Sequence, residues 1–467
     1  MPLIIPSNSI SAGGYEVDNS LRFNGGSSDY ISRTLGSGDD RRKLTFSWWI
    51  KRATPGTDYF ISGMSGSNEF NFFFDSSGRF GIDDFNGSAY GFQLRTNRVF
   101  RDTSAWMHFC LAFDTTQGTS TNRIKLYING TQYTWDNQTT QPSQNYEVQT
   151  NISGRVLEIG RLGSPYNTSY ADMYLAEMVF IDGQALDPTS FGEFDEDTGI
   201  WKPIDVSGLT FGTNGFYLDF ENSGSLGADV SGNGNNFTVN NLTSIDQTTD
   251  TPTNNFATAN PLHFSVTIPS AGTLSDGNLT FTSSQGASAY PVFYSTMGVS
   301  QGKWYTEFKV TTANSAVIGI GSGIPSGGFF GGGLYDYGYY YNGAFYNNGG
   351  NTGSQSSYTD GDIISVAMDL DNNKIYVAKN NTWQHSGDPS AGTGGYTITA
   401  PSSTDTGVYH IAYGDIGGGT PAIQGNFGNP PFTIASGNSD ANGIGNFEYA
   451  VPSGYYALNT KNLAEFG

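Results

Sequence analysis

The chain has 467 residues, more than one domain usually holds, so two or three domains are expected. Charged residues make up only 13% of the sequence, whereas glycine occurs 63 times and aromatic residues reach 14%. Glycine suits turns and aromatic residues suit pleated sheets, so this composition favours an all-β protein with little helix. The net charge of −21 argues against a nucleic-acid partner, because phosphate binding needs Lys and Arg.

The one cysteine, Cys110, rules out an intramolecular disulfide. No uncharged apolar run approaches the roughly 18–20 residues of a membrane-spanning helix, so no membrane insertion is expected. Residues 1–17 contain prolines followed by a Ser/Asn/Gly cluster, which predicts an extended N-terminal arm. The apolar side chains of Leu3, Ile4 and Ile5 would either dock on another subunit or fray with the arm.

A series of short strand patterns follows the arm. In one of them, Ile124, Leu126 and Ile128 alternate with more polar neighbours, and Asn129-Gly130 supplies a hairpin turn. The succession of WMHFCLAFD, IKLYINGTQ, LEIG and MYLAEMVFIDGQALDP resembles laminin-G-like and pentraxin-like modules. That resemblance implies a concanavalin A-like sandwich over residues 18–192.

Residues 193–262 differ in character and predict a partly structured connector. Within it, Phe216, Leu218 and Phe220 alternate and need a sheet to cover them, so residues 214–242 are expected to fold back and complete the first sandwich. A bridging strand pair between domains is the alternative. The polar, proline-bounded stretch at residues 251–261 is predicted to be the true linker.

Residues 302–383 carry a second set of strand patterns. Apolar residues alternate from Ile364 to Leu370, and Asp371-Asn372-Asn373 predicts a tight hairpin after them. The order GKWYTEFKV, VIGIG, GYYYNGAFYNNGG and DGDIISVAMDLDNNKIYVAKNNTW resembles the core of the SPRY domain. The resemblance implies a second concanavalin A-like sandwich over residues 263–435, followed by a C-terminal segment at 436–467. The predicted fold is therefore all-β, with two antiparallel sandwiches (jelly rolls) joined by the connector.

The whole layout, from the Ile/Pro arm to the YAVPSGYYALNTKNL ending, resembles virion structural proteins of tailed bacteriophages, of the tail-fibre or head-fibre type. This implies a non-enzymatic protein at the virion surface, on head or tail, that serves adhesion or assembly. The expected form is a short fibre or spike component whose lectin-like modules bind host-surface glycans or proteins. Other virion proteins would be its partners, it would form a homo-oligomer, and Leu3, Ile4 and Ile5 would dock on the particle.

Three alternatives stay open at this stage. One is a capsid decoration or head-fibre protein without a receptor role. Another is a carbohydrate-binding lectin that is independent of any particle. The third is a glycan-degrading enzyme of the laminarinase-like sandwich class, which would need a pair of carboxylates facing one cleft.

The residue patterns give little support to catalysis. Laminarinase-like enzymes carry Glu-x-Asp-x-x-Glu on one strand, and the nearest stretch here, EFDED at residues 193–197, lacks the last glutamate at the right offset. Cys110 and His108 lie on one strand face, as core neighbours would, and the four histidines show no metal-ligand spacing. We therefore predict no catalytic residue and no organic cofactor.

Calcium is the inorganic ligand that remains open, because some laminin-G-like and pentraxin-like modules bind it through loop carboxylates. The candidate ligands are Asp29, Asp39, Asp40, Asp83 and Asp84. They form no recognisable ligand string, and solvated turn acids are the alternative interpretation.

Aromatic residues are concentrated among glycines at residues 327–353. One interpretation is a hairpin that turns at Asn342-Gly343 with alternate rings in the core. The other is an exposed surface for a glycan or protein, because aromatic rings stack on sugars and Tyr adds a hydroxyl. The contact candidates are Phe329, Phe330 and Tyr335 in this tract and, more weakly, Trp135 and Trp383 beside polar turn residues.

Overall fold

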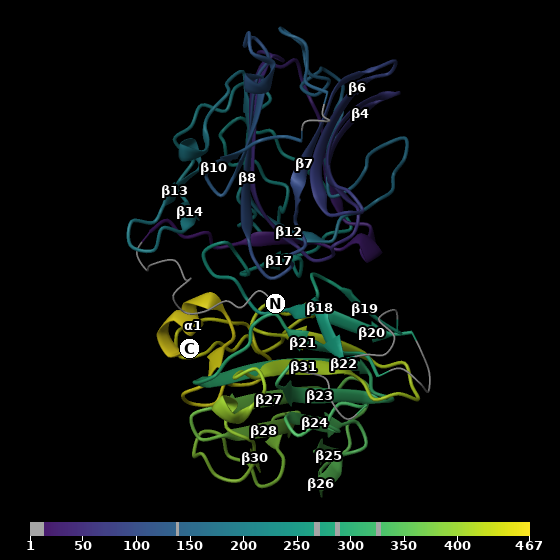
Figure 1. The fold of residues 1–467 in the computed structure, drawn as a ribbon, viewed down its shortest axis with the longest axis vertical. Coiled ribbons are helices and arrows are strands. Elements are labelled where there is room, and N and C mark those ends of the chain that lie inside the picture. Colours follow the sequence, from purple (N-terminus) through teal and green to yellow (C-terminus); the bar gives the residue numbers. More distant parts are fainter. Residues whose placement is uncertain (1–13, 137–139, 266–270, 285–289, 324–327) are drawn as a thin grey trace. The chain divides into compact units, whose positions relative to one another are not determined.

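The computed structural model describes residues 14–136, 140–265, 271–284, 290–323 and 328–467. Within these residues the secondary structure is almost entirely β, with a single α-helix, α1 (Thr460–Phe466). The chain forms two compact units, with the boundary between Thr253 and Asn254, and each contains two large, mainly antiparallel sheets packed on an apolar core (Figure 1). The predicted all-β fold with two sandwiches is confirmed. No helix in the described ranges is long and apolar enough to cross a membrane.

The first sandwich consists of two facing sheets, named here after a central strand. The β3 sheet contains, in spatial order, β10 (Thr131–Tyr133), β9 (Ile124–Ile128), β8 (Met107–Asp114), β3 (Lys43–Arg52), β12 (Met173–Asp182), β1 (Ser20–Phe23) and β17 (Gln247–Thr248), with β15 (Phe216–Leu218) also paired to β12. The β5 sheet contains β16 (Thr238–Asn240), β2 (Tyr30–Thr34), β11 (Val156–Ile159), β4 (Asp58–Ser65), β5 (Asn68–Phe74), β6 (Arg79–Asn86) and β7 (Tyr90–Val99). A separate hairpin is formed by β13 (Gly192–Phe194) and β14 (Trp201–Pro203).

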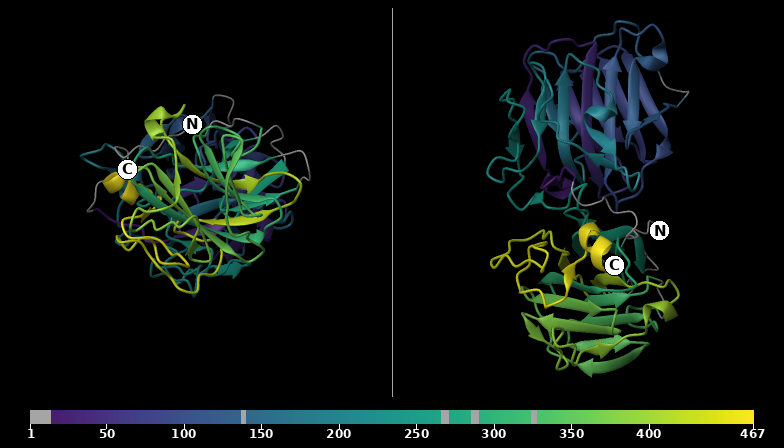
Figure 2. Two further views of the ribbon diagram at one scale, coloured as in Figure 1. Left: turned by 90° about the horizontal axis from the view of Figure 1, so that it is seen from below. Right: turned by 90° about the vertical axis from the view of Figure 1, so that its left-hand side faces the viewer.

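The two-residue period of each strand decides which side chains enter the core. In β5, Phe70, Phe72 and Phe74 are fully buried between the sheets, while the residues between them point to the other face. On the facing sheet, Trp48 of β3 stacks on its register partner Phe109 of β8, with ring centres 5.5 Å apart. Each fully buried ring of this kind stabilises the fold by about 1.5–3 kcal/mol. The right-hand view of Figure 2 shows the long strands of this sandwich side by side.

Part of the connector folds back onto the first sandwich. β15 pairs with β12 and β16 pairs with β2, so residues 214–242 extend both sheets, and Phe216 meets Phe237 edge-to-face at 4.9 Å. Near the end of this segment, the carboxylate of Asp250 forms an ion pair of 2.7 Å with the ammonium of Lys51, and both side chains are fully buried. The boundary between the two units, at Thr253, lies inside the stretch predicted to be the linker. The chain reaches the core of the second sandwich soon afterwards, at Ala257.

The second sandwich also has two facing sheets. The β23 sheet contains β18 (Ala259–Ser265), β21 (Val292–Ser295), β31 (His410–Asp415), β23 (Ala316–Gly321), β24 (Asp336–Tyr340), β25 (Ala344–Asn347) and β26 (Gly350–Ser354). The β22 sheet contains β19 (Gly272–Ser275), β20 (Thr280–Ser283), β32 (Ala422–Asn426), β22 (Lys303–Thr312), β27 (Ile363–Asp369), β28 (Lys374–Lys379) and β29 (Thr382–Trp383), with β30 (Tyr396–Thr397) on β28 and β33 (Tyr456–Ala457) parallel to β22.

The C-terminal segment belongs to this second unit and covers the outer face of the β22 sheet. The buried carboxylate of Glu307 accepts hydrogen bonds from the backbone amides of Glu448 and Tyr449, both at 2.8 Å. Phe447 packs edge-to-face on Tyr305 with ring centres 5.1 Å apart. Burial raises the pKa of Glu307, so the amides that hold this carboxylate also offset the cost of burying it.

Candidate functional site

The aromatic tract of the second sandwich folds against the outer face of the β23 sheet. Phe330 is only 1% exposed, and its ring fills a hollow over Gly321 and Gly338, where an added Cβ would come within 3.2 and 3.1 Å of it. The hydroxyl of Tyr340 donates a hydrogen bond of 2.5 Å to the carbonyl of Phe330. Phe330 is therefore an interior residue in this structure, which differs from the expectation that it contacts a ligand.

The remaining contact candidates lie in different environments. Phe329, Tyr335 and Trp383 are half-buried and keep part of their rings at the surface. Trp135 is 8% exposed and donates its indole N–H to the carbonyl of Ile124 at 2.9 Å, inside the first sandwich, so it is an interior residue as well. The structure does not bring these candidates together in one site. Leu3, Ile4 and Ile5 lie outside the described residues.

The acidic calcium candidates are spread over the first sandwich. Each carboxylate is held by donors of the protein: Asp29 by the amide of Asn24, Asp39 by Thr213, Asp40 by Arg42, Asp83 by Arg95, and Asp84 by Tyr146 and the amide of Gln149. Burial raises the pKa of Asp84 to about 6. Over the described ranges, no three His, Cys, Asp or Glu side chains are placed to hold a metal ion.

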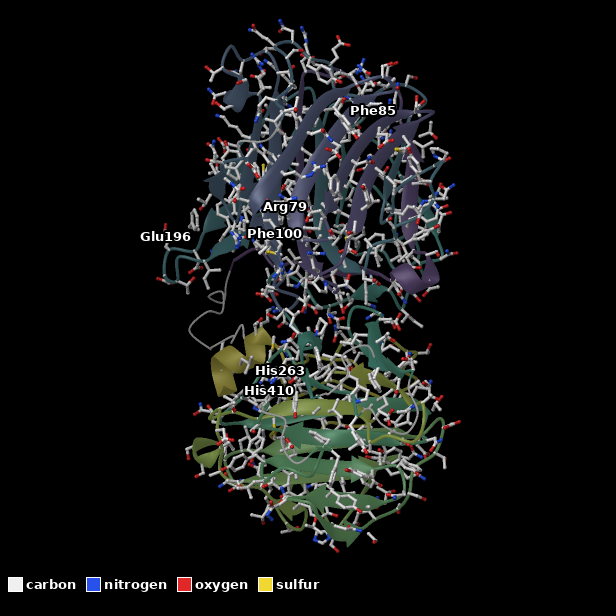
Figure 3. All side chains as sticks on the ribbon, turned by 45° about the vertical axis from the view of Figure 1, so that its right-hand side comes forward. Arg79, Phe85, Phe100, Glu196, His263 and His410 are labelled. Carbon is white, nitrogen blue, oxygen red and sulfur yellow. The ribbon has the colours of Figure 1, made fainter. Side chains whose placement is uncertain are left out.

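The residues weighed for catalysis also serve the fold. Burial lowers the pKa of His108 to about 3, and its ring nitrogens bond the hydroxyl of Ser47 (2.8 Å) and the indole N–H of Trp201 (3.1 Å). Cys110 is fully buried, and burial raises the pKa of its thiol, so the unreactive protonated form is favoured. In the EFDED stretch, Asp195 closes its own turn by accepting the amide of Thr198 (2.9 Å), while Glu196 points outward (Figure 3).

A different group of side chains, not identified from the sequence, lies on the outer face of the β5 sheet. We call it the tyrosine face, and it comprises Tyr59, Glu69, Phe73, Asp83, Phe85, Tyr90, Gln93, Arg95 and Tyr166. Strand alternation places most of these residues opposite the buried Phe positions, and Tyr166 comes from the loop after β11. Tyr90 and Tyr166 are 48% and 54% exposed, which is unusual for large aromatic side chains.

One end of the tyrosine face is a stack that crosses neighbouring strands. Tyr59 and Phe73 are register partners, and their rings stack with centres 4.9 Å apart. The guanidinium of Arg95 lies 4.4 Å from the centre of the Phe73 ring. Gly81 of β6 makes this possible, because an added Cβ there would come within 2.7 Å of the Arg95 side chain. Cation–π packing of this kind fixes the guanidinium against the sheet.

Polar groups occupy the middle of the face. Arg95 donates two hydrogen bonds, of 2.8 and 2.9 Å, to the carboxylate of Asp83. This paired geometry neutralises both charges and holds both groups in place. The carboxylate of Glu69 accepts two hydrogen bonds of 3.1 Å, one from the side-chain amide of Asn71 and one from the hydroxyl of Tyr166. The charged side chains are therefore fixed in position before any ligand arrives.

The other end of the face carries a second aromatic pair. Phe85 and Tyr90 lie with ring centres 5.0 Å apart. Figure 3 labels Phe85 and Arg79, which mark the two ends of β6. Burial and the nearby carboxylate of Asp83 raise the pKa values of Tyr59 and Tyr90, and the hydrogen bond to Glu69 raises that of Tyr166. All three phenols therefore stay neutral near pH 7 and can donate hydrogen bonds.

This combination of exposed rings and fixed polar groups is suited to binding. Phe73 is 5% exposed and supports Tyr59 and Arg95, whereas Tyr59, Phe85, Tyr90 and Tyr166 keep part of their rings at the surface. These exposed rings offer apolar surfaces, and the phenols, carboxylates and amides beside them can exchange hydrogen bonds with a polar ligand. Alternation in YGFQLRTNR could have placed Gln93 and Arg95 on the face opposite Phe92 and Leu94. The approach of Tyr166 to Glu69 depends on a distant loop and had no local signal.

Comparison with known proteins supports the fold of the first sandwich. Residues 24–182 match the Laminin_G_3 family model, described as the concanavalin A-like lectin/glucanases superfamily. This confirms the expected laminin-G-like, lectin-like fold for that part of the chain. No curated protein sequence matches the chain.

Several solved structures are similar at low identity. The SPRY domain of human HERC1 is 17% identical, with 36% of this chain and 96% of that chain covered and a TM-score of 0.28. A heptameric SAP-like pentraxin from Limulus polyphemus is 19% identical, with 36% and 78% covered and a TM-score of 0.27. Domains LG4-5 of the mouse laminin alpha1 chain are 12% identical, with 96% and 90% covered and a TM-score of 0.30. Values this low say nothing about the ligand of this chain.

Proposed function

We propose that this chain is a non-enzymatic binding protein of a tailed-bacteriophage virion, a component of a short fibre or spike whose first sandwich attaches to glycans on the host surface. The observation that carries the binding part is the tyrosine face, where Tyr90 and Tyr166 leave about half of their surface exposed beside fixed charged groups. A concanavalin A-like lectin fold over residues 24–182 supports the same activity.

The virion part of the proposal rests on the order of segments along the sequence. An Ile/Pro arm, a laminin-G-like module, a SPRY-like module and the YAVPSGYYALNTKNL ending follow one another as in phage structural proteins. In this proposal the arm residues Leu3, Ile4 and Ile5 dock on other virion proteins, and several copies assemble as a homo-oligomer at the virion surface.

A non-enzymatic role is supported by the state of the chain's reactive groups. Asp83 is neutralised by Arg95, and Glu69 is engaged by Asn71 and Tyr166, so neither carboxylate of the tyrosine face is set up as a free acid or base. The thiol of Cys110 is buried in an apolar cluster, away from solvent. Asp83 and Glu69 instead hold in place the surface on which a ligand would rest.

The test is a cryo-EM reconstruction of purified particles, combined with an adsorption assay. We expect the chain on the particle, and we expect the isolated protein to compete with particles for host cells. A Tyr90→Ala/Tyr166→Ala variant should compete poorly, whereas Val230→Ala, at a 46% exposed site elsewhere on the first sandwich, should compete normally. Absence of the chain from particles would end the virion proposal. A chain that lies on the capsid and does not affect adsorption would instead be a decoration protein.

A further inference from the structure

We infer that the tyrosine face takes a short, linear, uncharged oligosaccharide that lies obliquely across strands β4 to β7. This inference rests on the proposed glycan-binding function, but it does not depend on where the chain sits in a virion. It commits the face to one class of ligand and to one direction of binding.

The direction follows from the positions of the two aromatic pairs. Phe73 is the register partner of Gly81, and Phe85 is the register partner of Glu69, so the pairs lie four residues apart along β6. Four residues of a strand span about 13 Å. One sugar ring cannot reach from Tyr59 at one end to Tyr90 at the other, whereas a short chain of linked rings can. Because Tyr59 lies on β4 and Tyr90 on β7, the ligand would run obliquely across the strands.

The groups between the aromatic pairs fit the hydroxyls of a sugar chain. Asp83 and Gln93 are register partners in the middle of the face, and they offer a carboxylate acceptor and a carboxamide that both donates and accepts. Gln93 is half-buried, with Phe92 and Leu94 on either side of it in the core. Strand alternation directs the Gln93 side chain to the outer face, where its carboxamide can reach a ligand.

The preference for an uncharged ligand follows from the local charges. Arg79, Arg95 and Arg161, on and beside this sheet, each pair with a carboxylate of the protein, at 2.8, 2.8 and 2.6 Å. Glu69, in contrast, accepts hydrogen bonds from two neutral donors in the described part of the chain, the side-chain amide of Asn71 and the hydroxyl of Tyr166. Arg98, near the end of β7, lies outside the tyrosine face, with its guanidinium 5.1 Å from the centre of the Phe100 ring. The tyrosine face itself therefore offers no spare positive charge to an anionic sugar and would repel it weakly through Glu69.

The loop after β11 forms one side of the proposed site. Its backbone is tied to the sheet by the amide of Gly163 on the hydroxyl of Ser62 (3.1 Å) and by the amide of Ser164 on Glu158 (3.1 Å). This places Tyr166 over Glu69 and covers the sheet beside Ser62 of β4 and Glu158 of β11, whereas Tyr59 of β4 keeps part of its surface exposed. The ligand is then left with the surface that runs from Tyr59 across β5, β6 and β7.

The experiment is isothermal titration calorimetry of the full chain with neutral gluco-oligosaccharides, from monosaccharide to hexasaccharide, in β-1,3, β-1,4 and α-1,4 linkages, together with tetragalacturonate. We expect at least one neutral series to bind, with affinity rising with chain length until both aromatic pairs are covered. Tetragalacturonate should bind more weakly than the neutral chains. Tyr90→Ala should weaken binding by about two- to tenfold, the worth of one aromatic contact.

Two further variants separate a binding effect from misfolding. Tyr90→Phe keeps the ring and should retain most of the affinity, and Val230→Ala should bind like the wild type. Equal affinity for monosaccharide and hexasaccharide, or unchanged binding by Tyr90→Ala, would overturn the inference. So would failure to bind any of the sugars. If the protein bound none of them and still blocked adsorption, this inference would fail while the attachment function stood. If the chain bound the sugars as expected but were absent from particles, this inference would stand and the virion proposal would fail.

Discussion

Asp336 on β24 permits a quantitative test of the electrostatics inside the second sandwich. Its side chain is 2% exposed, and its Oδ1 atom has no hydrogen-bond partner in the described part of the chain. Burial raises its pKa from an ordinary 3.8 to about 7. His410 and Asp336 are both register partners of Gly321 and flank it on the sheet.

The sign of the pH effect follows from this raised pKa. Between about pH 4 and pH 7 the folded state binds a proton at Asp336 more readily than the unfolded state, so this residue's contribution to stability is present at acid pH and is lost as the pH rises through 7. Raising the pKa of Asp336 from 3.8 to about 7 corresponds to about 4 kcal/mol in the free energy of unfolding. Asp336→Asn keeps the shape and cannot ionise, so we expect it to be more stable than wild type by up to about 4 kcal/mol at pH 8 and by only about 1 kcal/mol at pH 4.5.

The assay is urea unfolding of the full chain at both pH values, with hydrogen exchange of peptides from β24 to assign the transition to the second sandwich. Burial lowers the pKa of His410 to about 4, so the contribution of His410 to folding stability decreases as the pH falls below 6.5. This decrease is the same in the wild type and in Asp336→Asn, so it cancels when the two proteins are compared. If the wild type and Asp336→Asn show the same dependence on pH, the carboxyl is not held protonated by burial and the reasoning is wrong.

Three other predictions concern the packing of each unit. Asp250→Ala should destabilise the first sandwich by about 3–5 kcal/mol in urea unfolding, because it removes the carboxylate that forms the ion pair with the buried ammonium of Lys51; a loss below 1 kcal/mol would show that the ion pair contributes little. Phe330→Ala should destabilise the second sandwich by about 3–5 kcal/mol, measured in the same way, since it empties the hollow over the glycines; an unchanged midpoint would mean that the ring is not packed as described. Cys110 should react with iodoacetamide only after unfolding, as followed by mass spectrometry, and modification of the native chain would contradict its burial.

Much of the fold could be predicted because strand patterns are local. The alternation from Ile364 to Leu370 appears as β27, with Ile364, Val366 and Met368 in the core. Asn342-Gly343 forms the turn between β24 and β25, with Gly343 at a φ of 89° that favours glycine. Each of these features depends on neighbours within a few residues, so the sequence is enough to predict them.

The candidate site could not be predicted in the same way, because it depends on which sheet face stays open. The sequence around Phe330 is compatible with an exposed contact residue. Its ring is buried because Gly321 of β23 and Gly338 of β24 leave room for it, and these glycines are separate from the sequence pattern that surrounds Phe330. Asp83 and Asp84 are neighbours in the sequence, yet Asp84 points into the protein toward Tyr146, whereas Asp83 lies on the outer face beside Arg95. Neighbours in sequence acquire opposite environments as soon as they lie on opposite faces of a sheet.

The covering segments explain why the tyrosine face is the place to look for a ligand. The outer face of the β3 sheet is covered by the connector through residues such as Phe211, that of the β22 sheet by Phe447, and that of the β23 sheet by Phe330. In each case the covering segment inserts an aromatic side chain of its own. The loop after β11 instead covers only part of the β5 sheet and presents Tyr166 to solvent. Aromatic side chains left at the surface beside fixed hydrogen-bonding groups gain little for folding, so a bound partner accounts for them best.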